Sequence, residues 1–106
     1  MAHAGYLEMA VGAMSRRDYL SAMQFGLRAA GAPRDQQSLR CDAQLLLALI
    51  AVELSAPEEA LAYAVGAHLT ASHARDGERE ERAEQVLGMV VTHFPQLADQ
   101  MLHTFH

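Results

Sequence analysis

Small residues lie along one stripe of a predicted helix in the segment SAPEEALAYAVGA, residues 55–67. Ala60, Ala64 and Ala67 share a face because side chains three or four positions apart are neighbours on a helix. A helix that only covered a core would carry larger apolar residues there. The stripe therefore indicates that another helix backbone comes very close.

The same stripe occurs earlier in the chain, which predicts a repeat. It consists there of Ala22, Gly26 and Ala29, and a shift of 38 residues places it on the later stripe. The same shift places Leu7 on Leu45, and a second shift places Pro57 on Pro95. The third copy is degraded, as a terminal copy can be when its outer face meets solvent. We therefore expect one domain over residues 1–106, built from two good copies and one degraded copy of a helix pair.

Prolines and glycines divide the chain into segments with helical periodicity, and no segment is long and β-branched enough for a strand. We expect helices at residues 3–14, 18–31, 38–54, 57–74, 78–93 and 95–105. Ser15 and Asp18 are candidate N-caps of the second helix. Ser55 is the candidate N-cap of the fourth, which has Pro57 in its first turn. The fold class is predicted to be all-α.

The repeated pairs carry a family resemblance. Their first helices contain an apolar residue followed by a small one, Met9-Ala10 and Leu47-Ala48. Their second helices read DYLSAMQFGLRA and APEEALAYAVGA, with an aromatic at Tyr19. This arrangement resembles the tetratricopeptide repeat (TPR), although the shift of 38 residues exceeds that family's usual period of about 34. The resemblance implies a right-handed stack of about three antiparallel helix pairs, with six helices in all.

The predicted helix at 38–54 is apolar on every side from Leu45 to Leu54, where Glu53 is the one polar residue. Such a helix must be covered all round. Neighbours in a stack would cover two or three sides, and the resemblance implies that the remaining side lines a concave groove. In the family's register the groove residues are Leu7, Val11, Met14, Leu45, Leu49, Val52, Leu87 and Val90. We expect this apolar groove to hold a partner's amphipathic helix, and the alternative is that these side chains only form core.

Composition and motifs exclude several classes of function. A net charge of −5 disfavours nucleic acid, which selects basic surfaces. The longest apolar run is too short to span a bilayer, so no membrane insertion is expected. With Cys41 as its one cysteine, the chain is expected to be cytoplasmic. Because no nucleophile motif or phosphate-binding glycine loop occurs, we predict that the chain is not an enzyme and uses no cofactor.

Histidines and a charged run are the remaining candidates for a site. His68 and His73 fall on different faces of a helix, and the two histidines nearest the C-terminus lie where fraying is expected, so the sequence predicts no metal site. The run RDGEREERAE, residues 75–84, places Glu78 and Arg82 at the spacing of a helix ion pair. We interpret this run as a solvated helix start.

Together these features predict a non-enzymatic protein–protein interaction module whose groove binds an amphipathic helix or peptide. In size, acidity and helical content the chain is similar to the small TPR-like chaperones of bacterial type III secretion. That similarity implies an export substrate and a second small helical chaperone as partners. A homodimer, in which a second copy fills the groove, stays open. The alternative from another class is a regulatory adaptor or sensor domain that binds a small ligand or peptide, and a small ligand needs a closed pocket.

Overall fold

The computed structural model describes residues 2–99, and within them every regular element is a helix. The helices are α1 (His3–Ser15), α2 (Tyr19–Ala30), α3 (Gln37–Glu53), α4 (Pro57–His73) and α5 (Gly77–His93). Residues 96–99 are also helical, and the rest of the helix predicted at 95–105 lies outside the described residues. The all-α prediction is confirmed, and every predicted end of the first five helices is within one residue of the structure.

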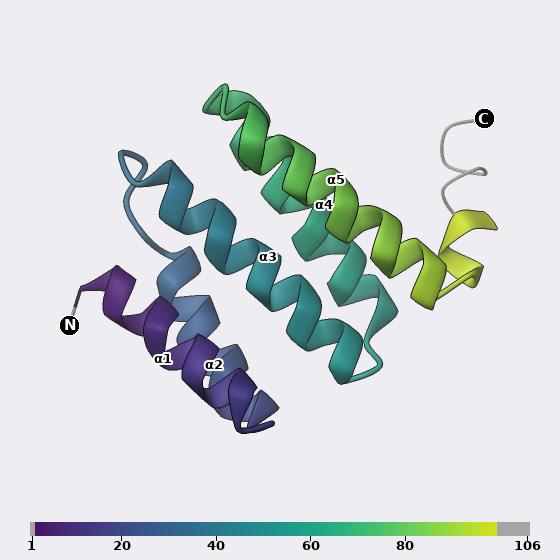
Figure 1. Ribbon diagram of the computed structural model, residues 1–106, viewed down its shortest axis with the longest axis horizontal. Coiled ribbons are helices and arrows are strands. Elements are labelled where there is room, and N and C mark those ends of the chain that lie inside the picture. Colours follow the sequence, from purple (N-terminus) through teal and green to yellow (C-terminus); the bar gives the residue numbers. More distant parts are fainter. Residues whose placement is uncertain (1, 100–106) are drawn as a thin grey trace.

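Consecutive helices pack antiparallel and form two layers (Figure 1). The helices α1, α3 and α5 lie side by side in the nearer layer, with α2 and α4 behind them. The central helix is α3, which contacts all four others. Because α1 and α5 flank it, one side of α3 faces the space between them.

Three of the four connections between these helices use the same tight turn. One residue in each has a left-handed backbone with positive φ, and none is glycine: Arg17 (60°), Ser55 (54°) and Arg75 (54°). The next backbone N–H donates to the carbonyl five positions earlier, as from Asp18 to Ala13 at 2.9 Å. This bond is the signature of the Schellman motif. The connection at residues 31–36 is longer and contains Pro33.

The predicted helix caps have mixed outcomes. Asp18 is the N-cap of α2, and its Oδ1 accepts a hydrogen bond from the backbone N–H of Ser21 at 3.3 Å. Ser15 instead belongs to α1, where its hydroxyl donates to the carbonyl one turn earlier. The cap predicted at Ser55 is wrong. Ala56 holds that position without a side-chain bond, because Ser55 is the left-handed residue of the turn.

Both stripes of small residues are buried, as their pattern predicts; they are Ala22, Gly26 and Ala29 in α2, and Ala60, Ala64 and Ala67 in α4. A methyl group at Gly26 would lie 2.9 Å from Cδ2 of Leu47. In α4, the carbonyl of Ala67 accepts a hydrogen bond from the Cys41 thiol at 3.4 Å. In each case a side chain of α3 reaches the backbone of its neighbour. Larger residues on the stripes would keep the helices apart.

Burial is greatest in α3, as expected for a helix that is apolar on every side. Its buried residues are Cys41, Ala43, Leu45, Leu47, Ala48, Ile50, Ala51 and Val52. Among the described residues, no helix is both long enough and apolar enough to cross a membrane.

Gly26→Leu should lower the free energy of unfolding by about 1–3 kcal/mol, because the new side chain would overpack Leu47, which is 1% exposed. Gly88→Leu is the matched control, since nothing lies within 4 Å of a Cβ at that position. Leucine is a better helix former than glycine, so the control should be at least as stable as the wild type. Urea unfolding measures all three proteins. Equal midpoints for the two variants would contradict the close contact between α2 and α3.

Arg17→Gly should raise the free energy of unfolding by about 1 kcal/mol, because glycine adopts the left-handed backbone without a Cβ clash. The neighbouring Arg16 is also exposed but has an ordinary φ of −87°. Arg16→Gly should therefore leave stability unchanged or lower it, since glycine there only increases the freedom of the unfolded chain. Thermal melts compare the two variants. The opposite order of stability would count against this turn geometry.

Candidate functional site

An open hollow of about 240 Å³ lies between α1, α3 and α5. It is lined by Leu7 and Val11 of α1, by Asp42, Leu45, Leu46 and Leu49 of α3, and by Arg82 of α5. Val11 is 50% exposed, whereas Leu45 is 6% exposed and also belongs to the core. The lining of the hollow thus includes the accessible side chain of Val11 and the buried side chain of Leu45, which also packs in the core.

Four of the predicted groove residues line this hollow, namely Leu7, Val11, Leu45 and Leu49. The other four lie elsewhere. Val52 and Val90 are buried in a core cluster with Phe94 and Leu97. Met14 packs against the core beside Ile50, and Leu87 is half-buried outside the lining.

The predicted groove is therefore corrected to a shorter one. The chain after α5 places Phe94 and Leu97 against Val52 and Val90, so this end of the predicted groove is core. What stays accessible is the part of α3 that begins near Asp42. The repeat register could not predict that the groove is shorter. It aligns equivalent positions of successive helix pairs, but it does not show which of them the residues after α5 bury.

Leu46, Asp42 and Arg82 line the hollow but were missed by sequence reasoning. Asp42 had a usable signal, since it lies three and seven positions before Leu45 and Leu49 and so shares their helix face. Because Asp42 is charged, a pattern of apolar groove residues does not include it. Arg82 had no such signal, because its place beside α3 depends on how α5 packs.

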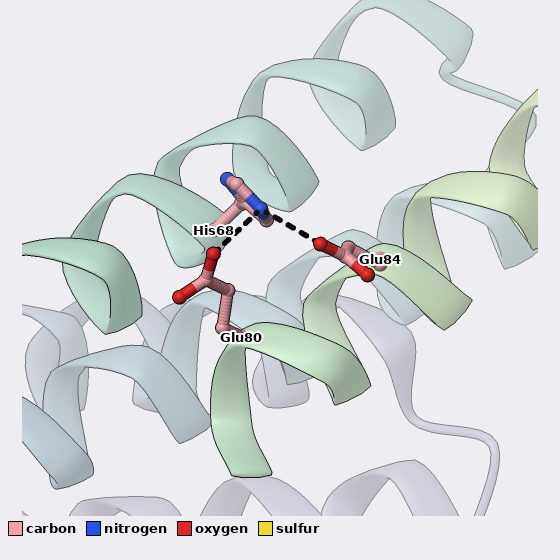
Figure 2. A group of neighbouring side chains, drawn as sticks. All are labelled: His68, Glu80 and Glu84. Atoms are coloured by element: carbon pink, nitrogen blue, oxygen red, sulfur yellow. Dashed lines mark hydrogen bonds and ion pairs between the residues drawn. The ribbon is translucent and has the colours of Figure 1, made fainter. Parts of the chain in front are cut away.

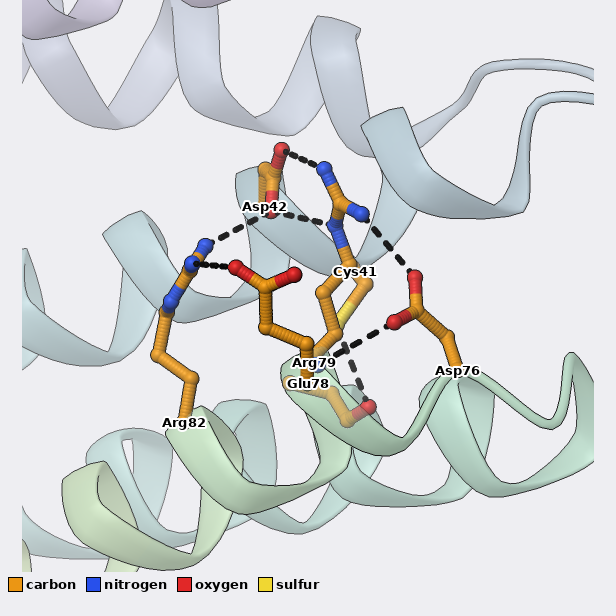
Figure 3. Close-up of polar contacts among 7 residues, drawn as sticks. Cys41, Asp42, Asp76, Glu78, Arg79 and Arg82 are labelled. Carbon is orange, nitrogen blue, oxygen red and sulfur yellow. Dashed lines mark hydrogen bonds and ion pairs between the residues drawn. The ribbon is translucent and has the colours of Figure 1, made fainter.

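Two polar clusters hold α5 against its neighbours, on different sides of the helix. One joins α5 to α4 and contains His68, Glu80 and Glu84 (Figure 2). The other joins α5 to α3 at the edge of the hollow (Figure 3). We call the second one the charged clamp; it consists of Asp42, Asp76, Arg79 and Arg82.

The centre of the charged clamp is a bidentate ion pair between Arg79 and Asp42. Arg79 donates from Nε to Oδ1 of Asp42 at 2.9 Å and from Nη2 to Oδ2 at 3.0 Å. Its Nη1 donates to Oδ2 of Asp76 at 2.9 Å, and Nη1 of Arg82 lies 3.8 Å from Oδ1 of Asp42. Paired bonds of this kind fix the relative orientation of both groups. The clamp therefore sets where α5 starts relative to α3.

The interpretation of residues 75–84 as only a solvated helix start is incomplete. The expected pair is present, since Nη2 of Arg82 donates to Oε1 of Glu78 at 3.2 Å. Arg79, however, crosses to another helix, and its hydrogen bonds to Asp42 and Asp76 raise its pKa. The Arg79 side chain and backbone N–H in turn lower the pKa of Asp76. The run is an inter-helix contact as well as a helix start.

Cys41 lies close to the clamp (Figure 3) but is unsuited to nucleophilic chemistry. It is 1% exposed, and its thiol donates to the carbonyl of Ala67. Burial raises the pKa of the thiol, with a further contribution from Asp42. The protonated thiol is the unreactive form, so Cys41 acts here as a core residue.

The cluster around His68 was not found from the sequence. Nε2 of His68 lies 3.4 Å from Oε1 of Glu84 and 3.7 Å from Oε1 of Glu80. One potential ligand atom from each residue falls within 4.8 Å of the others. The spacing of histidines along one helix gives no sign of this cluster. The partners of His68 are glutamates on the next helix, and only the packing of α4 on α5 brings them together.

In comparisons with known proteins, no family model, no curated protein and no solved structure matches this chain. Its function is therefore inferred from the hollow and the two polar clusters.

The charged clamp should make the free energy of unfolding decrease at acidic pH. Arg79 lowers the pKa of Asp76 below its ordinary value of 3.8, so the ionised carboxylate stabilises the folded protein above that pH. This contribution is lost as the pH falls through the lowered pKa. Asp76→Asn removes the charge but keeps a side chain that can cap a helix. The wild type should exceed this variant in stability most clearly near neutral pH, with a difference that shrinks below about pH 4.

Urea unfolding at a series of pH values measures this difference. Asp35→Asn, in the exposed connection between α2 and α3, is the control. It should change stability less at neutral pH, because it removes a carboxylate outside the clamp. A wild-type advantage over Asp76→Asn that stays constant from neutral to acidic pH would rule out stabilisation by the charge of Asp76.

Proposed function

We propose that this chain is a non-enzymatic interaction module that binds an amphipathic helix of a partner protein in the hollow between α1, α3 and α5. The lining of the hollow carries the proposal. Five of its seven side chains are aliphatic, and the other two are the charged residues Asp42 and Arg82. An apolar hollow of this kind can receive a few side chains from the apolar stripe of a partner helix.

The size and openness of the hollow favour a helix over a small ligand. Pockets for drug-sized ligands have volumes of roughly 300–1,000 Å³ and enclose most of the ligand. The hollow is smaller, at about 240 Å³, and it is open. A docked helix needs only to insert a few side chains of its apolar stripe. The geometry therefore supports the interaction module over the alternative of a small-ligand sensor.

The charged residues that line the hollow suggest which charge the partner carries beside its apolar stripe. Asp42 is engaged by Arg79, and Arg82 pairs with Glu78 but keeps 48% of its side chain exposed. Arg82 can therefore receive an acidic residue that flanks the partner's apolar stripe. A second copy of the chain is a less suitable occupant, because two molecules with a net charge of −5 each repel one another.

In this proposal the two layers form a TPR-like stack. The first helices of the pairs are α1, α3 and α5, and the hollow belongs to their concave face. Contacts of α3 with both α1 and α5 support this reading, as do the buried small-residue stripes of α2 and α4. A role as a type III secretion chaperone, with an export substrate and a second helical chaperone as partners, is a narrower form of the same proposal.

In-cell photo-crosslinking tests where the partner docks. A photoreactive amino acid in place of Val11, which lines the hollow and is 50% exposed, should capture the partner through its amphipathic helix. The same group in place of Leu20, which is 71% exposed on α2, should not capture it. Equal capture of one protein at both positions would place the contact outside the hollow.

Val11→Glu should then weaken binding of the captured helix by about tenfold or more, because its carboxylate would face an apolar stripe without a partner. Leu20→Glu adds the same charge on the other layer and should change the affinity by less than about twofold. Circular dichroism should show both variants folded, since both positions are exposed. Fluorescence anisotropy with the labelled helix gives the affinities. Wild-type affinity for Val11→Glu would refute docking in the hollow.

A further inference from the structure

His68 of α4 and two glutamates of α5, Glu80 and Glu84, converge in a way that the docking function does not use (Figure 2). We infer that these three side chains form a binding site for a divalent transition-metal ion of the zinc class, which would bridge α4 and α5. Imidazole and carboxylate groups are both established ligand types for zinc.

The distances from His68 to the two glutamates are close to those between ligands of one metal ion, and all three ligand atoms lie within 4.8 Å of one another. With metal–ligand bonds of about 2.0–2.2 Å, neighbouring ligand atoms of a tetrahedral zinc ion lie roughly 3.3–3.5 Å apart. Nε2 of His68 is 3.4 Å from Oε1 of Glu84 and 3.7 Å from Oε1 of Glu80. All three side chains are partly exposed, so small rotations can bring them onto an ion.

The direct contacts of His68 with the two glutamates are longer than the shortest ion pairs of the protein. Charge-assisted hydrogen bonds between nitrogen and carboxylate oxygen are about 2.7–2.9 Å long. Both contacts of His68 exceed that length, whereas the clamp pair between Arg79 and Asp42 falls at 2.9 and 3.0 Å. The one hydrogen bond, between Nε2 of His68 and Oε1 of Glu84 at 3.4 Å, is long, and these spacings are compatible with an ion between the three groups.

The backbone holds the proposed ligands in place. Glu80 and Glu84 are one turn apart on α5 and share a face. Next to His68, the small residues Ala67 and Ala71 of α4 share a core cluster with Ala83 of α5. This close packing fixes the two helices against each other before any ion binds.

The ligand set also indicates which metal binds. One imidazole with two carboxylates suits zinc and its neighbours among the divalent transition metals, whereas magnesium and calcium prefer all-oxygen sites. Three protein ligands leave a fourth position for water. Residues 75–84 contain five acidic and three basic residues, and this local net charge of −2 attracts cations.

Calorimetric titration of the chelator-treated full chain with zinc chloride tests the site. We expect binding with one ion per chain at this site, and no heat from magnesium chloride. His68→Gln and Glu84→Gln should each weaken zinc binding by at least about tenfold. His73→Gln, on the same helix but a different face, is the matched control and should keep the wild-type affinity within about twofold.

A second readout follows from the bridge between two helices. Saturating zinc should raise the thermal midpoint of the wild type and of His73→Gln, because the ion binds only the folded arrangement. It should not raise the midpoint of His68→Gln. Circular dichroism without metal checks that all variants fold. Absence of zinc binding by the wild type, or wild-type affinity in either ligand variant, overturns the site whether or not a helix docks in the hollow.

Discussion

The packing of α3 against four other helices is the constraint on which the structure depends. A helix with leucines on every side must be covered by its neighbours, and α2 and α4 can come close enough only where they present small residues. The contacts of Leu47 with Gly26 and of Cys41 with the Ala67 carbonyl are the two places where this closeness is visible. The small residues on α2 and α4 therefore leave the space that the large side chains of α3 fill.

The hollow is a consequence of the same arrangement. The four neighbouring helices leave part of α3 uncovered between α1 and α5, where Leu46 and Leu49 stay half-buried. The pair between Asp42 and Arg79 stands at the edge of this opening. Solvent-exposed ion pairs typically contribute about 0–1 kcal/mol, whereas bidentate pairs in a network of charges contribute more. The clamp thus helps to fix the orientation of α5 against α3 beside the hollow.

Local patterns in the sequence predicted the features that depend on a single helix. The helix ends and the buried stripes follow from periodicity and from glycine and proline positions. Four of the five aliphatic hollow residues were expected from the register of the resembled family, and Leu46 was not. Features that depend on how two helices are rotated against each other were missed. Asp42 and Arg79 are 37 positions apart, and His68 and Glu84 are 16 apart. Nothing in either helix alone marks these residues as partners.

The misplaced groove residues have a similar cause. Val52 and Val90 occupy repeat positions that would face a concave surface, yet Phe94 and Leu97 cover them. A repeat register assumes that each pair is followed by an equivalent one. Here the residues after α5 differ from that expectation, because Phe94 and Leu97 join Val52 and Val90 in the core.

The three walls of the hollow differ in how they are held. The walls from α1 and α3 are fixed by core contacts, such as those of Ala13 and Ile50. In α5, Ala83 is the one buried residue between positions 77 and 85. This half of α5 is positioned by the packing of Ala83 in a core cluster with α3 and α4, and by two polar contacts, the charged clamp toward α3 and the His68 cluster toward α4. Ion pairs near the surface weaken when salt screens their charges or when their carboxylates become protonated. Apolar packing is much less sensitive to either change. The α5 wall is therefore the one whose position depends most on the ionic surroundings of the protein.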